Sequence, residues 1–269
     1  MCGLAYASAL LMPVASPKAG QASRVILDPL PKVYVYDHCP FCVRVRLGFG
    51  LKNLKYETVF MANDDIPTPT ALVGKKIAPI FEDKDVDVCM AESMDIVKLA
   101  DADPRYGAVG QIKPATDRDD IKAWMKTVKA RNSMMQRPRY MMSYLPEFAN
   151  EDGKNAFVKN HPVGGVEKSE WKDDSKWSFD QRWSAYVDSY KQSLLEIDDV
   201  TASLKELDDL IFCEDYCTEG GLSYDDIDLW SRLRSLTIIK GVTWPTKTWK
   251  YMKNLSTKGD VPLLDCMQC

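Results

Sequence analysis

The residues best suited to chemistry in this sequence are the two cysteines of Tyr36-Asp37-His38-Cys39-Pro40-Phe41-Cys42. A β-prone run, 33–36, precedes the pair, and a helical-looking run, 43–52, follows it. The amino-terminal end of a helix presents unpaired backbone N–H groups and a positive partial charge. That environment favours thiolate, the nucleophilic form of cysteine. The pattern predicts thiol–disulfide chemistry, with Cys39 attacking and the less exposed Cys42 resolving the mixed disulfide.

Three nearby residues support this interpretation. Arg44 and Arg46 are expected to add positive charge to the same helix. Pro40 suits a first helical turn, because its missing N–H costs nothing there. Half of a zinc site is the alternative, but it would need a second matched pair nearby, and the surrounding segment has none. We therefore predict redox use and no metal at this pair.

Composition limits the classes of function. The chain has 269 residues, 45% hydrophobic and 28% charged, with a net charge of -4, which argues against a nucleic-acid-binding surface as the main function. No apolar run approaches the roughly 18 residues of a membrane span. Eight irregularly spaced cysteines predict a reducing compartment, cytoplasmic or organellar, rather than a disulfide scaffold. With only two histidines, a mechanism built on several of them is not expected.

The first 31 residues differ from the rest. They contain four prolines, many Ala and Ser residues, and no acidic residue before Asp28. Their apolar stretch, 4–15, is short and lacks the basic stretch that precedes it in a secretory signal. We expect residues 1–31 to be a flexible extension or the remnant of an organelle-targeting segment.

Residues 32–102 have the pattern of an α/β unit. Short β-prone runs alternate with helical runs, and a hairpin is expected around Asp83-Lys84-Asp85. This order predicts a mixed sheet packed against helices. The expected strands are 33–36, 56–61, 80–81 and 86–89, and the expected helices are 43–50 and one that starts after Glu92-Ser93.

Proline and glycine positions divide the rest of the chain. Residues 103–115 carry two prolines and two glycines and are interpreted as an interdomain linker. Residues 116–269 are predicted to form an all-helical domain. Within it, the polar segment at about 150–177 is interrupted by glycine and proline and is interpreted as an insertion between helices.

Three helix starts are marked locally. Thr116 is expected to cap the first of them, followed by acidic residues that suit a positive helix end. Ser178 starts a second helix with an apolar stripe, which we interpret as core. Ser223 and Asp226 have capping-box spacing at a third. The acidic residues are Asp117, Asp119 and Asp120, and the stripe is Phe179, Trp183, Tyr186, Tyr190 and Leu194.

Two further motifs have both a structural and a functional interpretation. Pro79 before a strand can simply mark a boundary, or a cis Ala78–Pro79 bond can turn the Ala78 backbone towards a peptide-like ligand. Glu92-Ser93 can be an ordinary helix start. Alternatively, the helix N–H groups and the Ser93 hydroxyl can hold a carboxylate while Glu92 takes an ammonium group.

Several segments in the same order resemble the glutaredoxin 2 family of bacteria, glutaredoxins built like a glutathione transferase. The resemblance extends from about Val33 almost to the C-terminus. The matching segments are 36–42, Phe-Gly-Leu-Lys-Asn (49–53), Asn-Asp-Asp (63–65), Thr-Pro-Thr (68–70), Val-Gly-Lys-Lys-Ile-Ala-Pro-Ile (73–80), Glu-Ser-Met-Asp-Ile-Val (92–97), Leu-Ser-Tyr-Asp-Asp-Ile (222–227), Leu-Arg-Ser-Leu-Thr (233–237) and Trp-Pro (244–245).

The resemblance implies a thioredoxin-like N-terminal domain and a glutathione-transferase-like helical C-terminal domain, with glutathione bound between them as co-substrate. It implies a Cys-Pro-Phe-Cys site that reduces glutathionylated proteins, with Cys39 as nucleophile and Cys42 as resolving thiol. It also implies a set of glutathione-binding residues. These are Pro40, Phe41, Ala78, Pro79, Glu92 and Ser93.

The sequence also departs from the family pattern. The extension before Val33 and most of 150–177 have no counterpart, and Phe41 stands where tyrosine is usual. Phe41 also occurs in a membrane-associated prostaglandin synthase family, which lacks the other segments. The additions motivate an alternative function, a non-catalytic subunit docked to a protein partner through the extension or through Trp171 and Trp177. A glutathione transferase is disfavoured because its chemistry needs no dithiol, and Pro40 disfavours an Fe–S-bridged dimer by analogy.

Four cysteines in the helical part support one more hypothesis. Cys213 with Cys217, and Cys266 with Cys269, could form a four-thiolate zinc site or a disulfide that ties down the tail. Unconnected thiols are the alternative.

Overall fold

The computed structural model describes residues 24–269. Among these, strands β1 (Lys32–Val35), β2 (Glu57–Phe60), β3 (Ile80–Asp83) and β4 (Val88–Ala91) form one sheet in the order β2-β1-β3-β4. β1 pairs parallel with β2, whereas β3 is antiparallel to both β1 and β4. A parallel pair needs a crossover, which α1 (Pro40–Leu51) supplies. The predicted thioredoxin-like sheet is therefore confirmed.

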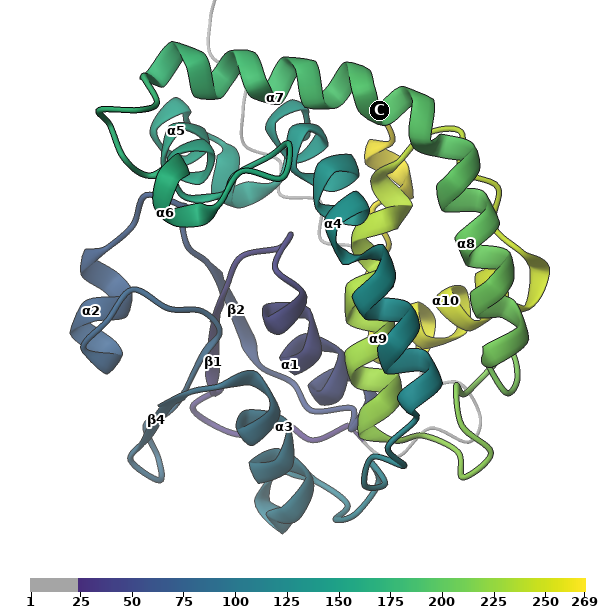
Figure 1. Ribbon diagram of the computed structural model, residues 1–269. Helices are drawn as coiled ribbons and strands as arrows, with labels where there is room; N and C mark the ends of the chain where they lie inside the picture. Colours follow the sequence, from purple (N-terminus) through teal and green to yellow (C-terminus); the bar gives the residue numbers. More distant parts are fainter. Residues whose placement is uncertain (1–23) are drawn as a thin grey trace, which may run out of the picture.

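Helices make up most of the remaining chain (Figure 1). α3 (Ser93–Ala102) packs against α1, and α2 (Pro67–Val73) contacts β3 and β4. The α-helices after residue 118 stand beside α1 and arch around it, which confirms the predicted helical C-terminal part. They are α4 (Asp119–Met142), α5 (Glu151–Asn160), α6 (Lys168–Trp171), α7 (Phe179–Ser193), α8 (Ile197–Leu210), α9 (Tyr224–Arg234) and α10 (Thr246–Gly259).

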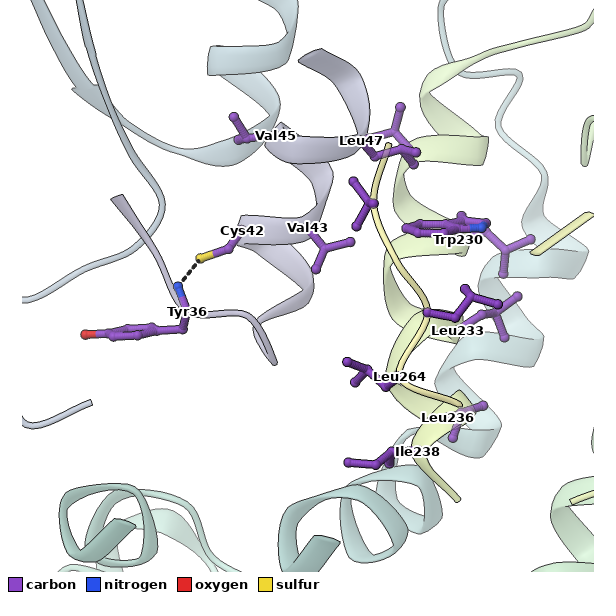
Figure 2. Packing of buried hydrophobic residues seen from close by; sticks show 14 of the residues in the cluster. Tyr36, Cys42, Val43, Val45, Leu47, Trp230, Leu233, Leu236, Ile238 and Leu264 are labelled. Atoms are coloured by element: carbon purple, nitrogen blue, oxygen red, sulfur yellow. Dashed lines mark hydrogen bonds between the residues drawn. The ribbon is translucent and has the colours of Figure 1, made fainter. Parts of the chain in front are cut away.

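α1 is the central helix of the molecule. Every residue from Cys42 to Phe49 is buried, because α3 covers one side of α1 and α9 and α10 cover another. Figure 2 shows Val43 and Leu47 pointing towards Trp230 on α9. A helix that is buried all round is apolar all round, as this one is apart from its two arginines. The orientation of the cysteine pair at its start is therefore set by both halves of the chain.

Three local expectations are wrong in detail. The hairpin strands are 80–83 and 88–91, so the turn lies later than expected, at 84–87. α4 begins at Asp119 rather than after Thr116, because the Thr116 N–H and hydroxyl donate to Asp225 at 2.7 and 3.0 Å instead. In the α7 stripe Tyr186 is buried, but Phe179 and Leu194 at its ends are about half exposed.

Two helix starts are as predicted. The Ser178 hydroxyl accepts from the Gln181 N–H at 3.2 Å, and the Gln181 side chain accepts from the Ser178 N–H at 2.8 Å. At α9 the Ser223 N–H donates to the Asp226 carboxylate at 2.9 Å. Both are capping boxes, in which side chains satisfy backbone donors that the helix leaves unpaired.

The segment 150–177 is part of the helical core. It contains α5 and α6, and the fully buried Trp171 donates from Nε1 to the Val158 carbonyl oxygen at 2.7 Å. The Trp171 and Trp177 rings pack with centroids 4.8 Å apart. Trp171 is therefore not an exposed docking residue, and the expectation of an arm that presents it is wrong. A protein partner for this segment stays a prediction.

The end of the predicted extension is attached to the sheet half. The Val25 N–H donates to the Asn53 carbonyl at 3.0 Å, and Val25 accepts from the Lys55 N–H at 2.8 Å. Most of the extension, residues 1–23, lies outside the described residues. No helix within residues 24–269 has the length and apolar character that crossing a membrane requires.

The predicted linker, 103–115, is held at both ends. Tyr106 is buried and donates to the Asp83 carboxylate at 3.0 Å. The Lys113 N–H donates to the Leu222 carbonyl at 2.9 Å, next to the start of α9. The domain boundaries themselves stay a prediction.

Candidate functional site

Cys39 is the N-cap residue of α1, in an extended backbone conformation. It is partly exposed, and its sulfur interacts with the Cys42 thiol and with the N–H groups of Phe41 and Cys42. The hydrogen bond from the Cys42 thiol is the largest influence on the Cys39 pKa, and nearby His38 adds to it. Against the opposing effect of burial, these lower the pKa of Cys39 to about 6. Cys39 can therefore be largely thiolate at neutral pH.

Cys42 has the opposite character. It is fully buried, and burial together with the neighbouring Cys39 sulfur raises its pKa well above the usual range. The Tyr36 N–H donates to its sulfur at 3.3 Å (Figure 2). One helical turn thus pairs a partly exposed sulfur that loses its proton readily with a buried one that keeps it.

The two arginines of α1 do not act on Cys39 as expected. Arg44 is paired with Asp228 of α9, and Arg46 is paired with Asp37. Both guanidinium groups are buried, and each shares its carboxylate with an arginine of α9: Asp228 also pairs with Arg232, and Asp37 also pairs with Arg234. Their positive charges form ion pairs that join α1 to neighbouring segments rather than acting on the Cys39 thiolate.

The remaining predicted residues gather at one end of the sheet. Pro79 comes directly before Ile80, which pairs with Tyr34 of β1 and with Ala91 of β4. Since β1 leads into the Cys39 loop and β4 leads into Glu92-Ser93, all three motifs lie at the same edge. The Ala78–Pro79 bond is cis, the alternative that favours a ligand role. Ala78 is partly exposed and Pro79 is buried.

Glu92 and Ser93 form the start of α3. Glu92 is exposed and has a φ of 75°, and Ser93 is buried as the first helical residue. The Ser93 hydroxyl accepts from Arg44 Nη1 at 3.3 Å, which connects this corner to α1. Phe41 is 45% exposed beside Cys39, with the Arg44 guanidinium 4.7 Å from its ring centre. The edge therefore offers exposed groups next to a helix start.

Sequence reasoning missed two residues of this region, His38 as a partner of the sulfur and Glu147. Glu147 is fully buried after α4, yet its carboxylate contacts His38 through both the backbone N–H and the ring. The two residues are 109 positions apart. No local pattern marks such a pair, although an acidic residue between Pro146 and Phe148, in an otherwise apolar run, is consistent with a buried carboxylate.

The hypothesis about the other cysteines finds no support within residues 24–269. Cys213, Cys217, Cys266 and Cys269 are all free, and no group of three or more potential metal ligands occurs there. Cys217 is buried beside Asp226, and burial followed by that carboxylate raises its pKa. The thiol of Cys269 instead lies near Arg139. The four thiols are therefore unconnected.

Comparisons with known proteins cover both halves of the chain. Residues 33–106 match the model "Glutathione S-transferase, N-terminal domain", and residues 120–267 match "Glutaredoxin 2, C terminal domain". Glutaredoxin 2 of Escherichia coli (strain K12) is 34% identical over 237 residues, which cover 88% of this chain and 99% of that protein.

Solved structures agree with these matches. Glutaredoxin 2 from Salmonella typhimurium, determined in complex with glutathione, has 33% identity and a TM-score of 0.73, covering 89% of this chain and 99% of that one. A glutathione S-transferase from Rhodospirillum rubrum has 13% identity and a TM-score of 0.51, covering 88% and 91%. At that identity the second likeness concerns the fold alone.

Proposed function

The chain belongs to the glutaredoxin 2 family, and we propose that it reduces mixed disulfides between proteins and glutathione through Cys39. Homology supports a glutathione-dependent oxidoreductase, since relatives that match nearly their whole length are glutaredoxins. A similar structure was solved with glutathione bound, which supports glutathione as co-substrate here.

The glutathione site of the proposal is the edge formed by the Cys39 loop, Pro79 and the start of α3. The backbone of Ala78, before the cis bond, would hold the glutathione backbone, and Pro40 and Phe41 would contact the sulfur end. Glu92 and Ser93 would hold the γ-glutamyl end. The N–H groups of the first turn of α3 suit its carboxylate, and the exposed Glu92 suits its ammonium group.

The reaction proceeds by two disulfide exchanges. The Cys39 thiolate attacks the glutathione sulfur of the mixed disulfide, so that a bond between Cys39 and glutathione forms as the bond to the substrate protein breaks. The substrate sulfur leaves as thiolate and takes a proton from solvent. A second glutathione thiolate then attacks the glutathionyl sulfur on Cys39, which yields glutathione disulfide and restores the Cys39 thiolate.

Cys42 supplies a second route. After losing its proton it attacks the Cys39 sulfur, which releases glutathione and leaves a Cys39–Cys42 disulfide for two further glutathione molecules to reduce. Because burial raises the pKa of Cys42, this route first requires the loss of a tightly held proton, which attack by free glutathione does not. Cys39 is thus required in both routes and Cys42 only in one.

The observation that carries the proposal is the asymmetry of the pair. Cys39, with a pKa of about 6, is at once a ready nucleophile and a good leaving group, whereas Cys42 retains its proton. A transferase acting on electrophiles would have no use for the second thiol.

The test is the reduction of a glutathionylated peptide by glutathione in the presence of the purified full chain. Cys39→Ser should reduce the rate to that of the uncatalysed reaction, whereas Cys42→Ser should keep most of it. Cys89→Ser, which changes an exposed thiol elsewhere, is the matched control. Full activity of Cys39→Ser would overturn the assignment.

A further inference from the structure

The residue directly before the proposed nucleophile is held by a carboxylate from the helical half. Glu147 lies in the 3₁₀ turn Pro146–Phe148 that follows α4. Its Oε1 accepts from the His38 backbone N–H at 2.8 Å and lies 2.5 Å from His38 Nδ1. Because a carboxylate only accepts, the ring hydrogen must lie on Nδ1. Any positive charge on the ring is then balanced by Glu147.

The His38 ring sits in an aromatic box. Tyr140, Phe148 and Phe157 of the helical half surround it, with ring centres 5.1, 5.1 and 5.0 Å away. Tyr36 stacks on it at 6.0 Å. Such a box fixes the ring plane and excludes water, so that Glu147 is its charged partner in an apolar setting. An unpaired charge would be costly there.

The same turn also holds the loop that follows β2. The backbone carbonyl of Glu147 accepts from the Asn63 N–H at 3.0 Å. Asn63 lies between β2 and α2, in a segment that begins where β2 ends beside β1. Glu147 therefore joins the loop that carries Cys39 to the neighbouring loop, through its side chain and its main chain respectively.

We propose that Glu147 is a positioning residue for Cys39: its carboxylate fixes the backbone and ring of His38, and so keeps the imidazole charge beside the nucleophilic sulfur. This inference rests on the proposed function of Cys39. Glu147 does not touch the sulfur or the substrate, and it acts through His38. The Glu147 carboxylate belongs to a segment remote from Cys39 in the sequence. A correctly folded helical half is therefore required for a reactive thiol.

The electrostatic surroundings agree with this role. The positive charge of His38 lowers the pKa of Cys39, after the larger effect of the Cys42 hydrogen bond and against burial. Burial opposes the ionisation of Glu147, but the hydrogen bonds and charge of His38 hold the pKa of Glu147 below its usual value. The titratable groups that face Cys39 or His38 are Cys42, Tyr36, Tyr140, Glu147 and His161.

The test measures the rate of Cys39 alkylation by iodoacetamide against pH, followed by peptide mass mapping so that other thiols do not interfere. Glu147→Gln keeps the shape and an acceptor oxygen but removes the charge. We expect its midpoint to rise by about one pH unit above that of the wild type, so that alkylation at pH 6 slows about fivefold. His38→Phe, which suits the aromatic box, should give a similar rise. Glu147→Asp, which keeps the charge on a shorter side chain, should show a smaller rise in the midpoint than Glu147→Gln.

Asp101→Asn is the matched control, since it also changes a buried carboxylate to an amide. Asp101 lies on α3 and pairs with Lys52, at the end of α1 away from Cys39. It should lower stability without moving the midpoint. An unchanged midpoint in folded Glu147→Gln would overturn the proposal, as would a rise in His38→Phe alone. If Glu147→Gln does not fold, His38→Phe decides: a raised midpoint supports the proposal, and an unchanged midpoint overturns it. Failure of the proposed function would appear separately, as absent turnover in the wild type.

Discussion

Arg234, the last residue of α9, holds the main chain of Asp37, two residues before the nucleophile. Its Nη1 donates to the Asp37 carbonyl oxygen at 2.6 Å and its Nη2 to the Asp37 carboxylate at 3.0 Å, across 197 positions of sequence. Its Nε donates to the Pro262 carbonyl at 2.7 Å. All three guanidinium nitrogens are thus used, and the side chain is fully buried. The helical half therefore binds the Cys39 loop through hydrogen bonds at both Asp37 and His38.

The Asp37 cluster should make the protein sensitive to acid. Burial opposes ionisation of Asp37, but Arg234 and Arg46 hold its pKa below the usual value. A carboxyl group whose folded pKa is depressed contributes stability above its unfolded pKa of about 3.9, and this is lost as pH falls through the folded pKa. Urea unfolding at pH 7 should show Asp37→Asn less stable by about 3 kcal/mol or more, because two buried cations lose their partner.

The control for this prediction is the same comparison at lower pH. Other groups, including Asp226, whose pKa is raised by burial, titrate in both proteins and cancel in the difference. The gap between wild type and Asp37→Asn should narrow from about pH 4 downwards. Parallel curves from pH 7 to pH 3 would contradict the assignment.

Ser93→Ala tests the anion site at the start of α3. Loss of one hydroxyl hydrogen bond should raise the KM for glutathione about fivefold, equivalent to about 1 kcal/mol, with little change in kcat. Steady-state kinetics with a glutathionylated peptide give both constants. Thr127→Ala removes an exposed hydroxyl that bonds only within α4, and it should change neither. A fall in kcat at constant KM would argue against a binding role for Ser93.

Gly50→Ala tests the contact between α1 and α10. A Cβ at Gly50 would overlap the backbone carbonyl of Gly259, and backbone cannot move aside as a flexible side chain can. We expect a loss of about 2 kcal/mol or more in the free energy of unfolding, measured by urea titration. Gly220→Ala, whose Cβ would meet nothing within 4 Å, is the control. Equal stability of the two variants would show that the helices are not in close contact.

Trp171→Ala tests whether the 150–177 segment belongs to the core. Removing this fully buried ring should cost about 3–5 kcal/mol in unfolding free energy. Leu195→Ala, at a position 76% exposed, should change it by less than about 0.5 kcal/mol. A segment that docks outside the core would instead give a Trp171→Ala variant of normal stability.

Much of the architecture could be predicted because its signals are local. The cysteine pair, the proline after Cys39 and the apolar run of α1 lie within one short stretch, and strand-to-helix order follows from neighbouring residues. The capping box of Ser223 and Asp226 spans three positions. Errors occurred where a distant partner competes: Thr116 does not cap α4, because Asp225, remote in sequence, takes its donors.

Local signals in the sequence were enough to identify the sulfur that starts α1, the strand that precedes it, and the start of another helix at residues 92–93. The surroundings of that sulfur depend on tertiary contacts. Arg44 and Arg46 look like activating charges in sequence, but in the structure they pair with Asp228 and Asp37. The sequence gives no sign of a role for His38, whose ring contacts the Glu147 carboxylate 109 positions further along the chain. Local backbone preferences act over a few residues, whereas burial and charge pairing depend on which distant segments packing brings together.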